Sequence, residues 1–125
     1  MGLQTLYSCD IYHLETTYDL INPYFGERFV RYHGSSFDFD LIDEADLLFV
    51  DSHHTYETVS KELEIHAHKI KKYIMFHDTV AFGEVGEDGG KGIMFAINEF
   101  LEANPEWKIV HQVDYNNGFM IIERQ

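Results

Sequence analysis

The sequence has few of the features that mark a secreted or membrane-inserted protein. Its 125 residues include one cysteine, Cys9, so no disulfide can form within the chain and a reducing compartment is expected. No apolar run approaches the roughly 20 residues of a membrane-spanning helix, and the N-terminus lacks a basic segment followed by an apolar one. We therefore expect a soluble, cytoplasmic protein with no membrane partner.

Basic residues are also scarce. Lys and Arg number nine against 22 Asp and Glu, which gives a formal net charge of −13 at pH 7. Proteins that bind nucleic acid present clustered Lys and Arg to the phosphates, and lysines come close together only at positions 69, 71 and 72. Nucleic acid is therefore not an expected partner.

The sequence does contain enough apolar material for a folded domain. Hydrophobic residues make up 45% of the chain and aromatic residues 15%, a composition that argues against disorder. Because 125 residues is close to the commonest domain size, residues 1–125 are predicted to form a single domain.

Strand-like and helix-like segments alternate along the chain. Unbroken apolar runs at residues 46–50 and 73–76 are typical of parallel strands covered on both faces, and the spacing of apolar positions in 55–72 predicts a crossover helix between them. Further strands are predicted at 5–11 and 28–33, helices at 14–25 and just after 92, and a closing hairpin at 107–113 and 118–122. This order predicts an α/β fold whose sheet is mostly parallel and ends in an antiparallel hairpin.

Ionisable residues follow both of the buried strands. Asp51 and His54 come after the first strand, and His77 and Asp78 come after the second. Because ligands bind beyond the carboxyl ends of neighbouring parallel strands, we expect these side chains to share one pocket, where Asp51, His77 and Asp78 would hold one divalent cation. Taken singly, each has a structural alternative: Asp51 as a helix cap, Asp78 in a turn, and His54 as a solvated loop residue.

A glycine-rich loop, GEVGEDGGKG, occupies residues 83–92. It does not match a phosphate-binding P-loop, because Val85 stands where the first glycine is needed and Gly92 stands where Ser or Thr is needed. We interpret the loop as a flexible lid or substrate loop, with glycines for mobility.

Taken in order, these features resemble the later two thirds of a class I S-adenosylmethionine (SAM)-dependent methyltransferase, which has a Rossmann-like, doubly wound sheet. The resemblance is closest to the metal-dependent O-methyltransferases grouped with cephalosporin hydroxylase-like and macrocin-type enzymes. It covers about residues 5–123. It rests on an apolar strand running into Asp-x-x-His-x-Tyr at 51–56, a helix, a strand ending in His-Asp-Thr at 77–79, a glycine-containing loop with a helix, and Asn-Gly at 117–118.

For the cofactor, the resemblance implies SAM bound near the first two strands. Asp10 matches the acid that usually receives the ribose hydroxyls, and Ser35, Ser36 and Phe37 lie where the adenine is usually flanked. The strand and glycine-rich turn that contact the methionine end of SAM have no counterpart here, and the family places that strand between the strands ending at Asp10 and Asp51. We therefore expect an N-terminally incomplete, partial methyltransferase-like domain, with a start upstream of Met1 as the favoured explanation. A strand from another polypeptide, as in a homo-oligomer, and a sheet that has closed up are the alternatives.

For the metal, the resemblance implies that Asp51 and Asp78 are ligands. His54 matches the histidine proposed as general base in sugar methyltransferases of this type, and His77 stands where the family commonly has an acid. Imidazole favours Mn, Fe or Zn over Mg, so both Mg and Mn remain candidates.

The function that the resemblance implies is SAM-dependent methylation of a hydroxyl group on a small molecule or sugar. The metal would bind the acceptor oxygens and lower the pKa of the hydroxyl, and His54 would remove its proton. Two alternatives stay open. One is a non-catalytic remnant or binding module of the same fold, and the other is a metal-dependent hydrolase that uses Asp51, His54, His77 and Asp78.

Overall fold

The computed structural model describes residues 4–12 and 15–125. The chain divides into two compact units, Met1–Leu41 and Ile42–Gln125. The candidate SAM-binding residues belong to the first unit, and the candidate metal-binding residues belong to the second. That residues 1–125 act as one domain stays a prediction.

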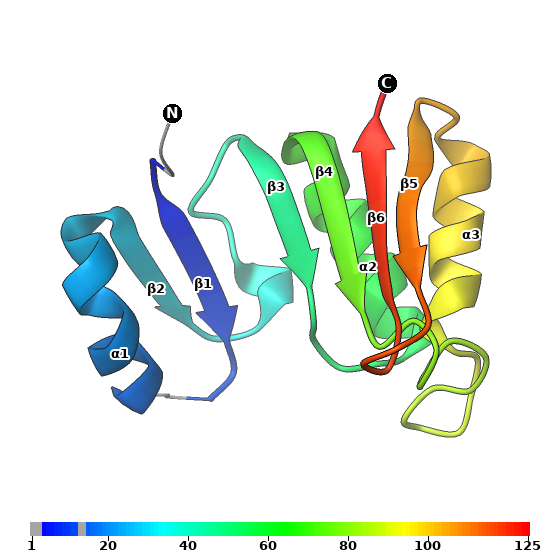
Figure 1. The fold of residues 1–125 in the computed structure, drawn as a ribbon, viewed down its shortest axis with the longest axis horizontal. Helices are drawn as coiled ribbons and strands as arrows, with labels where there is room; N and C mark the ends of the chain where they lie inside the picture. Colours follow the sequence, from blue (N-terminus) through cyan, green and yellow to red (C-terminus); the bar gives the residue numbers. More distant parts are fainter. Residues whose placement is uncertain (1–3, 13–14) are drawn as a thin grey trace. The chain divides into compact units, whose positions relative to one another are not determined.

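The first unit is built on two parallel strands joined by a helix (Figure 1). Gly26, with a φ of +54°, follows the helix and ends it, because glycine adopts the left-handed conformation without steric cost. The predicted helix start at Leu14 lies outside the described residues. The rings of Tyr7 and Tyr32 pack edge-on against the buried ring of Phe39. The elements are β1 (Leu6–Asp10), α1 (Glu15–Phe25) and β2 (Phe29–His33).

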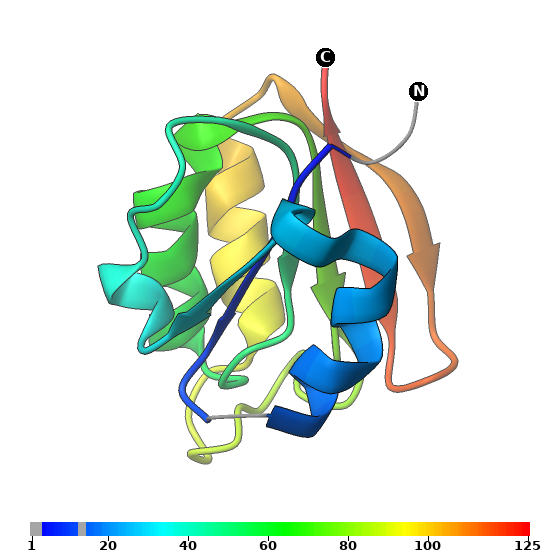
Figure 2. The same ribbon diagram turned by 90° about the vertical axis from the view of Figure 1, so that its left-hand side faces the viewer.

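The second unit is a four-stranded sheet with two helices. Its strand order is β3-β4-β6-β5, in which β3 and β4 are parallel and β6 is antiparallel to both of its neighbours (Figure 1). Figure 2 shows both helices on the same side of this sheet. The elements are β3 (Ala45–Val50), α2 (Tyr56–His66), β4 (Ile70–His77), α3 (Ile93–Ala103), β5 (Trp107–Val113) and β6 (Phe119–Arg124).

The core of the second unit lies between the sheet and the two helices. In the antiparallel register Ile74 pairs with Ile122 and Phe76 pairs with Met120, and all four side chains are fully buried. They form one cluster with apolar residues of both helices, namely Val59, Leu63, Ile93, Ala96 and Ile97. This cluster fixes β3 and β4 side by side and thereby fixes the position of the residues that follow them.

The opposite face of β3 is less covered than the sequence predicts. Leu47 and Phe49 are 47% and 52% exposed, whereas Val50, which points to the other face, is buried. The two helices of this unit cover one face of its sheet, so the apolar run at 46–50 is buried on one face only.

The crossover helix is shorter than predicted. The spacing of apolar residues predicts a helix to Lys72, but α2 ends at His66, a 3₁₀ turn spans Ala67–Lys69, and β4 already begins at Ile70. The prediction is wrong here because Ile70, three residues after the buried Ala67, continues the helical spacing, but it is the first residue of β4, where it pairs with Ala45 and its side chain joins the buried core. The predicted start of the helix is confirmed, with Thr55 Oγ1 accepting a hydrogen bond from the Thr58 N–H at 3.2 Å.

The predicted fold class is confirmed. β1 pairs with β2 and β3 pairs with β4, both in parallel, and β5 and β6 form an antiparallel hairpin. In the described residues β1 and β3 are not paired with each other, and the sheets are separate. No helix among the described residues combines the length and apolar content needed to cross a membrane.

Candidate functional site

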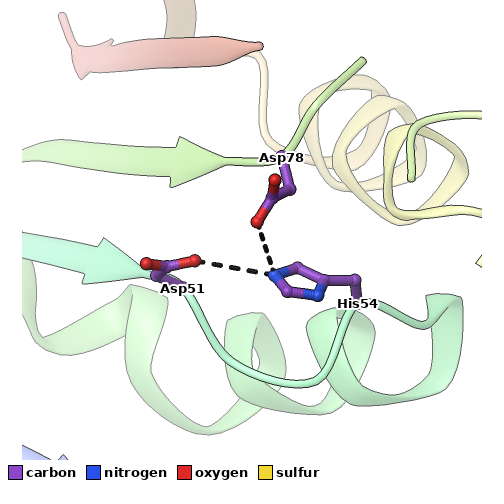
Figure 3. Close-up of side chains that lie close together, drawn as sticks. All are labelled: Asp51, His54 and Asp78. Carbon is purple, nitrogen blue, oxygen red and sulfur yellow. Dashed lines mark ion pairs between the residues drawn. The ribbon is translucent and has the colours of Figure 1, made fainter. Parts of the chain in front are cut away.

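The candidate site lies beyond the carboxyl ends of β3 and β4. Val50 pairs with Phe76 in the parallel register, so the residues that follow, Asp51 and His77, lie side by side at the carboxyl ends of the two strands. Asp78 comes one residue later, and His54 reaches the same place from the loop that leads to α2 (Figure 3). The structure thus brings together the strand-end residues that the sequence singles out.

Three potential ligand atoms form a compact group. His54 Nε2 lies 2.8 Å from Asp78 Oδ2 and 3.5 Å from Asp51 Oδ1, and the three ligand atoms all lie within 4.8 Å of one another. Ligand atoms held about 2.0–2.2 Å from one tetrahedral ion lie about 3.3–3.6 Å apart. The spacing therefore suits a single divalent cation.

His77 borders the same two carboxylates. Its Nδ1 lies 3.4 Å from Asp51 Oδ1 and 3.2 Å from Asp78 Oδ2, and its Nε2 lies 3.0 Å from the carbonyl oxygen of Asn116 in the turn before β6. Because a carbonyl oxygen only accepts, the neutral ring donates its hydrogen from Nε2 to Asn116. The lone pair of Nδ1 then faces the carboxylates, and the role of His77 as a metal ligand stays a prediction.

Asp78 is the buried member of the group. The residue is 6% exposed, whereas the side chain of Asp51 is 43% exposed. The backbone of Asp78 has a φ of +59°, which is uncommon for a residue other than glycine, and its carbonyl accepts the Phe82 N–H at 3.0 Å. Within the described part of the chain, the side chains at ion-pair distance from this carboxylate are the imidazoles of His54 and His77. A buried carboxylate on an unusual backbone conformation is typical of functional sites.

Two neighbours hold the ring of His54. It stacks on Phe82, with centroids 4.8 Å apart and planes 10° apart, and its Nδ1 lies 2.7 Å from Glu87 Oε1. Burial lowers the pKa of His54, but the hydrogen bond to Glu87 and the negative charge of Asp78 outweigh burial and raise the pKa above its ordinary value of 6.5. The same hydrogen bond lowers the pKa of Glu87 below its ordinary value of 4.5.

These residues fit a divalent cation. His54 Nε2 is buried and forms no hydrogen bond of normal geometry with any described residue, although Asp78 Oδ2 is 2.8 Å away. A cation held by the two carboxylates would lie beside this buried ring nitrogen. The combination of carboxylate and imidazole ligands suits Mn, Fe or Zn better than Mg, which prefers oxygen.

Glu87 contacts the site, although the sequence motifs do not single it out. It lies in the glycine-rich loop, which we expect to be a mobile lid, but the Glu87 N–H donates to the His54 carbonyl at 3.1 Å and the Gly86 N–H donates to Gly90 at 3.0 Å. A Cβ on Gly86 would lie 3.0 Å from the carbonyl oxygens of His54 and Lys91, so this glycine permits close backbone packing. The sequence signal that could have pointed to Glu87 is an acidic residue among closely spaced glycines, in the loop that follows His77 and Asp78.

The predicted SAM-binding residues lie together in the first unit. Asp10 pairs with His33, so Asp10 and the segment after β2 lie beyond the carboxyl ends of the same two strands. Asp10 Oδ1 accepts the Tyr12 N–H at 2.7 Å, and Ser35 Oγ accepts the Phe37 N–H at 3.2 Å, which caps the 3₁₀ turn Ser36–Asp38. The ring of Phe37 is exposed. The role of these residues stays a prediction.

Comparison with known proteins identifies the fold. No protein-family model and no curated protein matches the sequence. Solved structures do match, among them a protein from Staphylococcus aureus assigned as a caffeoyl-CoA O-methyltransferase (TM-score 0.67, 14% identity), a methyltransferase from Podospora anserina with S-adenosylhomocysteine bound (0.66, 16%), and a protein from Clostridium thermocellum assigned as an rRNA methylase (0.67, 17%). The chain has the methyltransferase fold.

The methyltransferase fold is matched over almost the whole of this chain but over only part of the solved structures. The matches cover 97%, 95% and 96% of this chain and 65%, 59% and 72% of the three chains, in the same order. The chain therefore spans less than two thirds of the first two. The resemblance to class I SAM-dependent methyltransferases is confirmed at the level of the fold.

Proposed function

We propose that the chain is part of a SAM-dependent O-methyltransferase that uses a divalent metal and acts on a hydroxylated small molecule or sugar. The observation that carries the proposal is the meeting of Asp51, His54 and Asp78 beyond the carboxyl ends of β3 and β4 in a methyltransferase fold. Ligands bind at this edge of an open α/β sheet. The S-adenosylhomocysteine bound to the Podospora structure supports SAM as the cofactor.

Each side chain has a proposed task. Asp51, His77 and Asp78 would hold the metal, and three protein ligands leave coordination positions open, as catalytic sites need. When bound, SAM supplies an electrophilic methyl group and the metal supplies a Lewis acid. His54 would act as general base, because its Nε2 lies beside the two carboxylates and therefore close to an acceptor oxygen that the metal would hold there.

The proposed acceptor is a small molecule rather than RNA. The names of the similar structures range from a caffeoyl-CoA enzyme to an rRNA methylase, so the fold alone does not select the acceptor. The net charge of −13 favours an acceptor without a phosphate backbone.

Metal binding tests the proposal directly. We expect calorimetry to show one Mn²⁺ or Co²⁺ bound per chain, and D78N to weaken the affinity by more than about tenfold, because it removes a buried charged ligand. E102Q is the matched control, since it makes the same charge change at an exposed residue of α3 and should leave the affinity unchanged. D78N that binds either metal as tightly as the wild type would contradict the proposed site.

H54A separates the two roles that His54 can have in this test. If His54 is the general base, H54A should keep the metal affinity close to that of the wild type. Methyl transfer to a panel of phenols, catechols and sugars should then fall by about 10²–10⁴-fold, because the base is lost. A loss of metal affinity equal to that of D78N would instead make His54 a ligand. Calorimetry with SAM on the complete protein, including any part beyond this chain, separates an enzyme from the binding-module alternative, which predicts no SAM binding.

A further inference from the structure

Glu87 contacts His54 through both its side chain and its backbone. Glu87 Oε1 lies 2.7 Å from His54 Nδ1, and the Glu87 N–H donates to the His54 carbonyl at 3.1 Å. The residues are 33 positions apart in the sequence, so folding rather than local chain geometry brings them together. The double contact fixes the carboxylate relative to the ring.

The loop that carries Glu87 is tied down on both sides of it. Val85 and Lys91 form a β-bridge, and the Gly89 N–H donates to the Gly86 carbonyl at 2.9 Å. The Tyr56 N–H donates to the Lys91 carbonyl at 3.1 Å, which joins the end of the loop to the start of α2. A carboxylate on such a loop can hold a partner in one orientation.

The chemistry of the contact determines which nitrogen of His54 carries the hydrogen. An ionised carboxylate only accepts hydrogen bonds, so the contact with Glu87 is a hydrogen bond when Nδ1 carries the hydrogen, and in that neutral tautomer Nε2 carries the lone pair. That lone pair lies on the side of Asp51 and Asp78, where Nε2 has no hydrogen bond of its own among the described residues. In metal sites and in catalytic histidine–carboxylate pairs, a carboxylate bonded to one ring nitrogen likewise fixes the tautomer and the orientation of the histidine.

We propose that Glu87 is a positioning residue for His54, whose carboxylate keeps the hydrogen on Nδ1 and aims the Nε2 lone pair at Asp51 and Asp78. The use of this lone pair as a base rests on the proposed function. The hydrogen-bond arrangement itself does not, so the two can fail separately.

Nitrogen NMR of the metal-free chain tests the arrangement. At about pH 9, where a histidine ring is neutral, we expect the ¹⁵N shifts of His54 to show one tautomer with the hydrogen on Nδ1. In E87Q the amide can donate as well as accept, so the shifts should move toward a mixture in which Nε2 also carries hydrogen. E102Q should leave them unchanged. A wild-type ring with its hydrogen on Nε2, or an E87Q spectrum identical with that of the wild type, would overturn the proposal whatever the chain catalyses.

Kinetics then test whether the arrangement serves the reaction. E87Q should lower kcat for methyl transfer at least tenfold while KM and metal affinity stay within about twofold of wild type, because the ligands are intact and only the base is misdirected. An E87Q kcat equal to that of the wild type would also overturn the positioning role. A complete wild-type protein, including any part beyond this chain, that transfers no methyl group would refute the proposed function and leave the NMR result standing.

Discussion

At the scale of single residues, Asp78 has three properties that seldom occur together. It is buried, it carries a carboxylate, and its φ of +59° places it in the left-handed region. Aspartate tolerates that region better than most residues because its side chain is short and polar. In this conformation the carboxylate of Asp78 lies 2.8 Å from His54 and 3.2 Å from His77, so this one side chain contacts both imidazoles of the site.

The pair formed by His54 and Glu87 predicts how stability depends on pH. The pKa of His54 is raised, so its contribution to stability is complete below 6.5 and is lost as the pH rises through its higher folded value. The pKa of Glu87 is lowered, so its contribution is complete above 4.5 and is lost as the pH falls through its lower folded value. Both contributions are therefore present together from pH 4.5 to 6.5.

Urea unfolding of metal-free wild type and E87Q across the pH range measures this contribution. The difference in free energy of unfolding between the two chains should be largest inside that window and should shrink on either side of it. Its size should be modest, because the Glu87 side chain is 36% exposed and solvent screens the pair. A difference that grows steadily toward alkaline pH would show that the pair is not coupled in this way.

At the scale of secondary-structure elements, β4 connects the core to the site. One face of this strand carries Ile74 and Phe76, which are fully buried against β6 and the helices, and its end delivers His77 and Asp78. The packing that stabilises the strand therefore also sets where the site residues leave the sheet.

Two substitutions of the same type test this division of the sheet. Ile74→Ala should lower the free energy of unfolding by about 2–5 kcal/mol, because it leaves a cavity in the core. Ile109→Ala on β5 should cost less than about 1 kcal/mol, because that side chain is 46% exposed. Denaturant unfolding of both variants gives the comparison, and equal losses would mean that the core is not where the structure puts it.

At the scale of the whole chain, charge and fold point to different acceptors. The fold is shared with a protein assigned as an rRNA methylase, yet this chain carries a net charge of −13. Long-range repulsion from a phosphate backbone is therefore the dominant electrostatic effect on an approaching RNA.

We expect the 125-residue chain not to bind an rRNA fragment at about 150 mM salt in a fluorescence anisotropy titration. Lowering the salt concentration should not produce binding, because with a net repulsive charge less screening strengthens the repulsion. Binding that tightens as salt is removed would reveal a basic surface and would move the proposed acceptor toward nucleic acid.

The sequence alone determined the order of strands and helices and the meeting of Asp51 with His77 and Asp78. Both follow from rules that act locally or through topology, namely the period of apolar residues and the side-by-side carboxyl ends of parallel strands. Tertiary structure decided the end of α2 at His66, because Ile70 fits the apolar spacing of a helix but begins a strand that pairs with β3 and is buried in the core from there. It also decided the role of Glu87, because a hydrogen bond between two loops depends on how they pack, which no spacing of residues encodes.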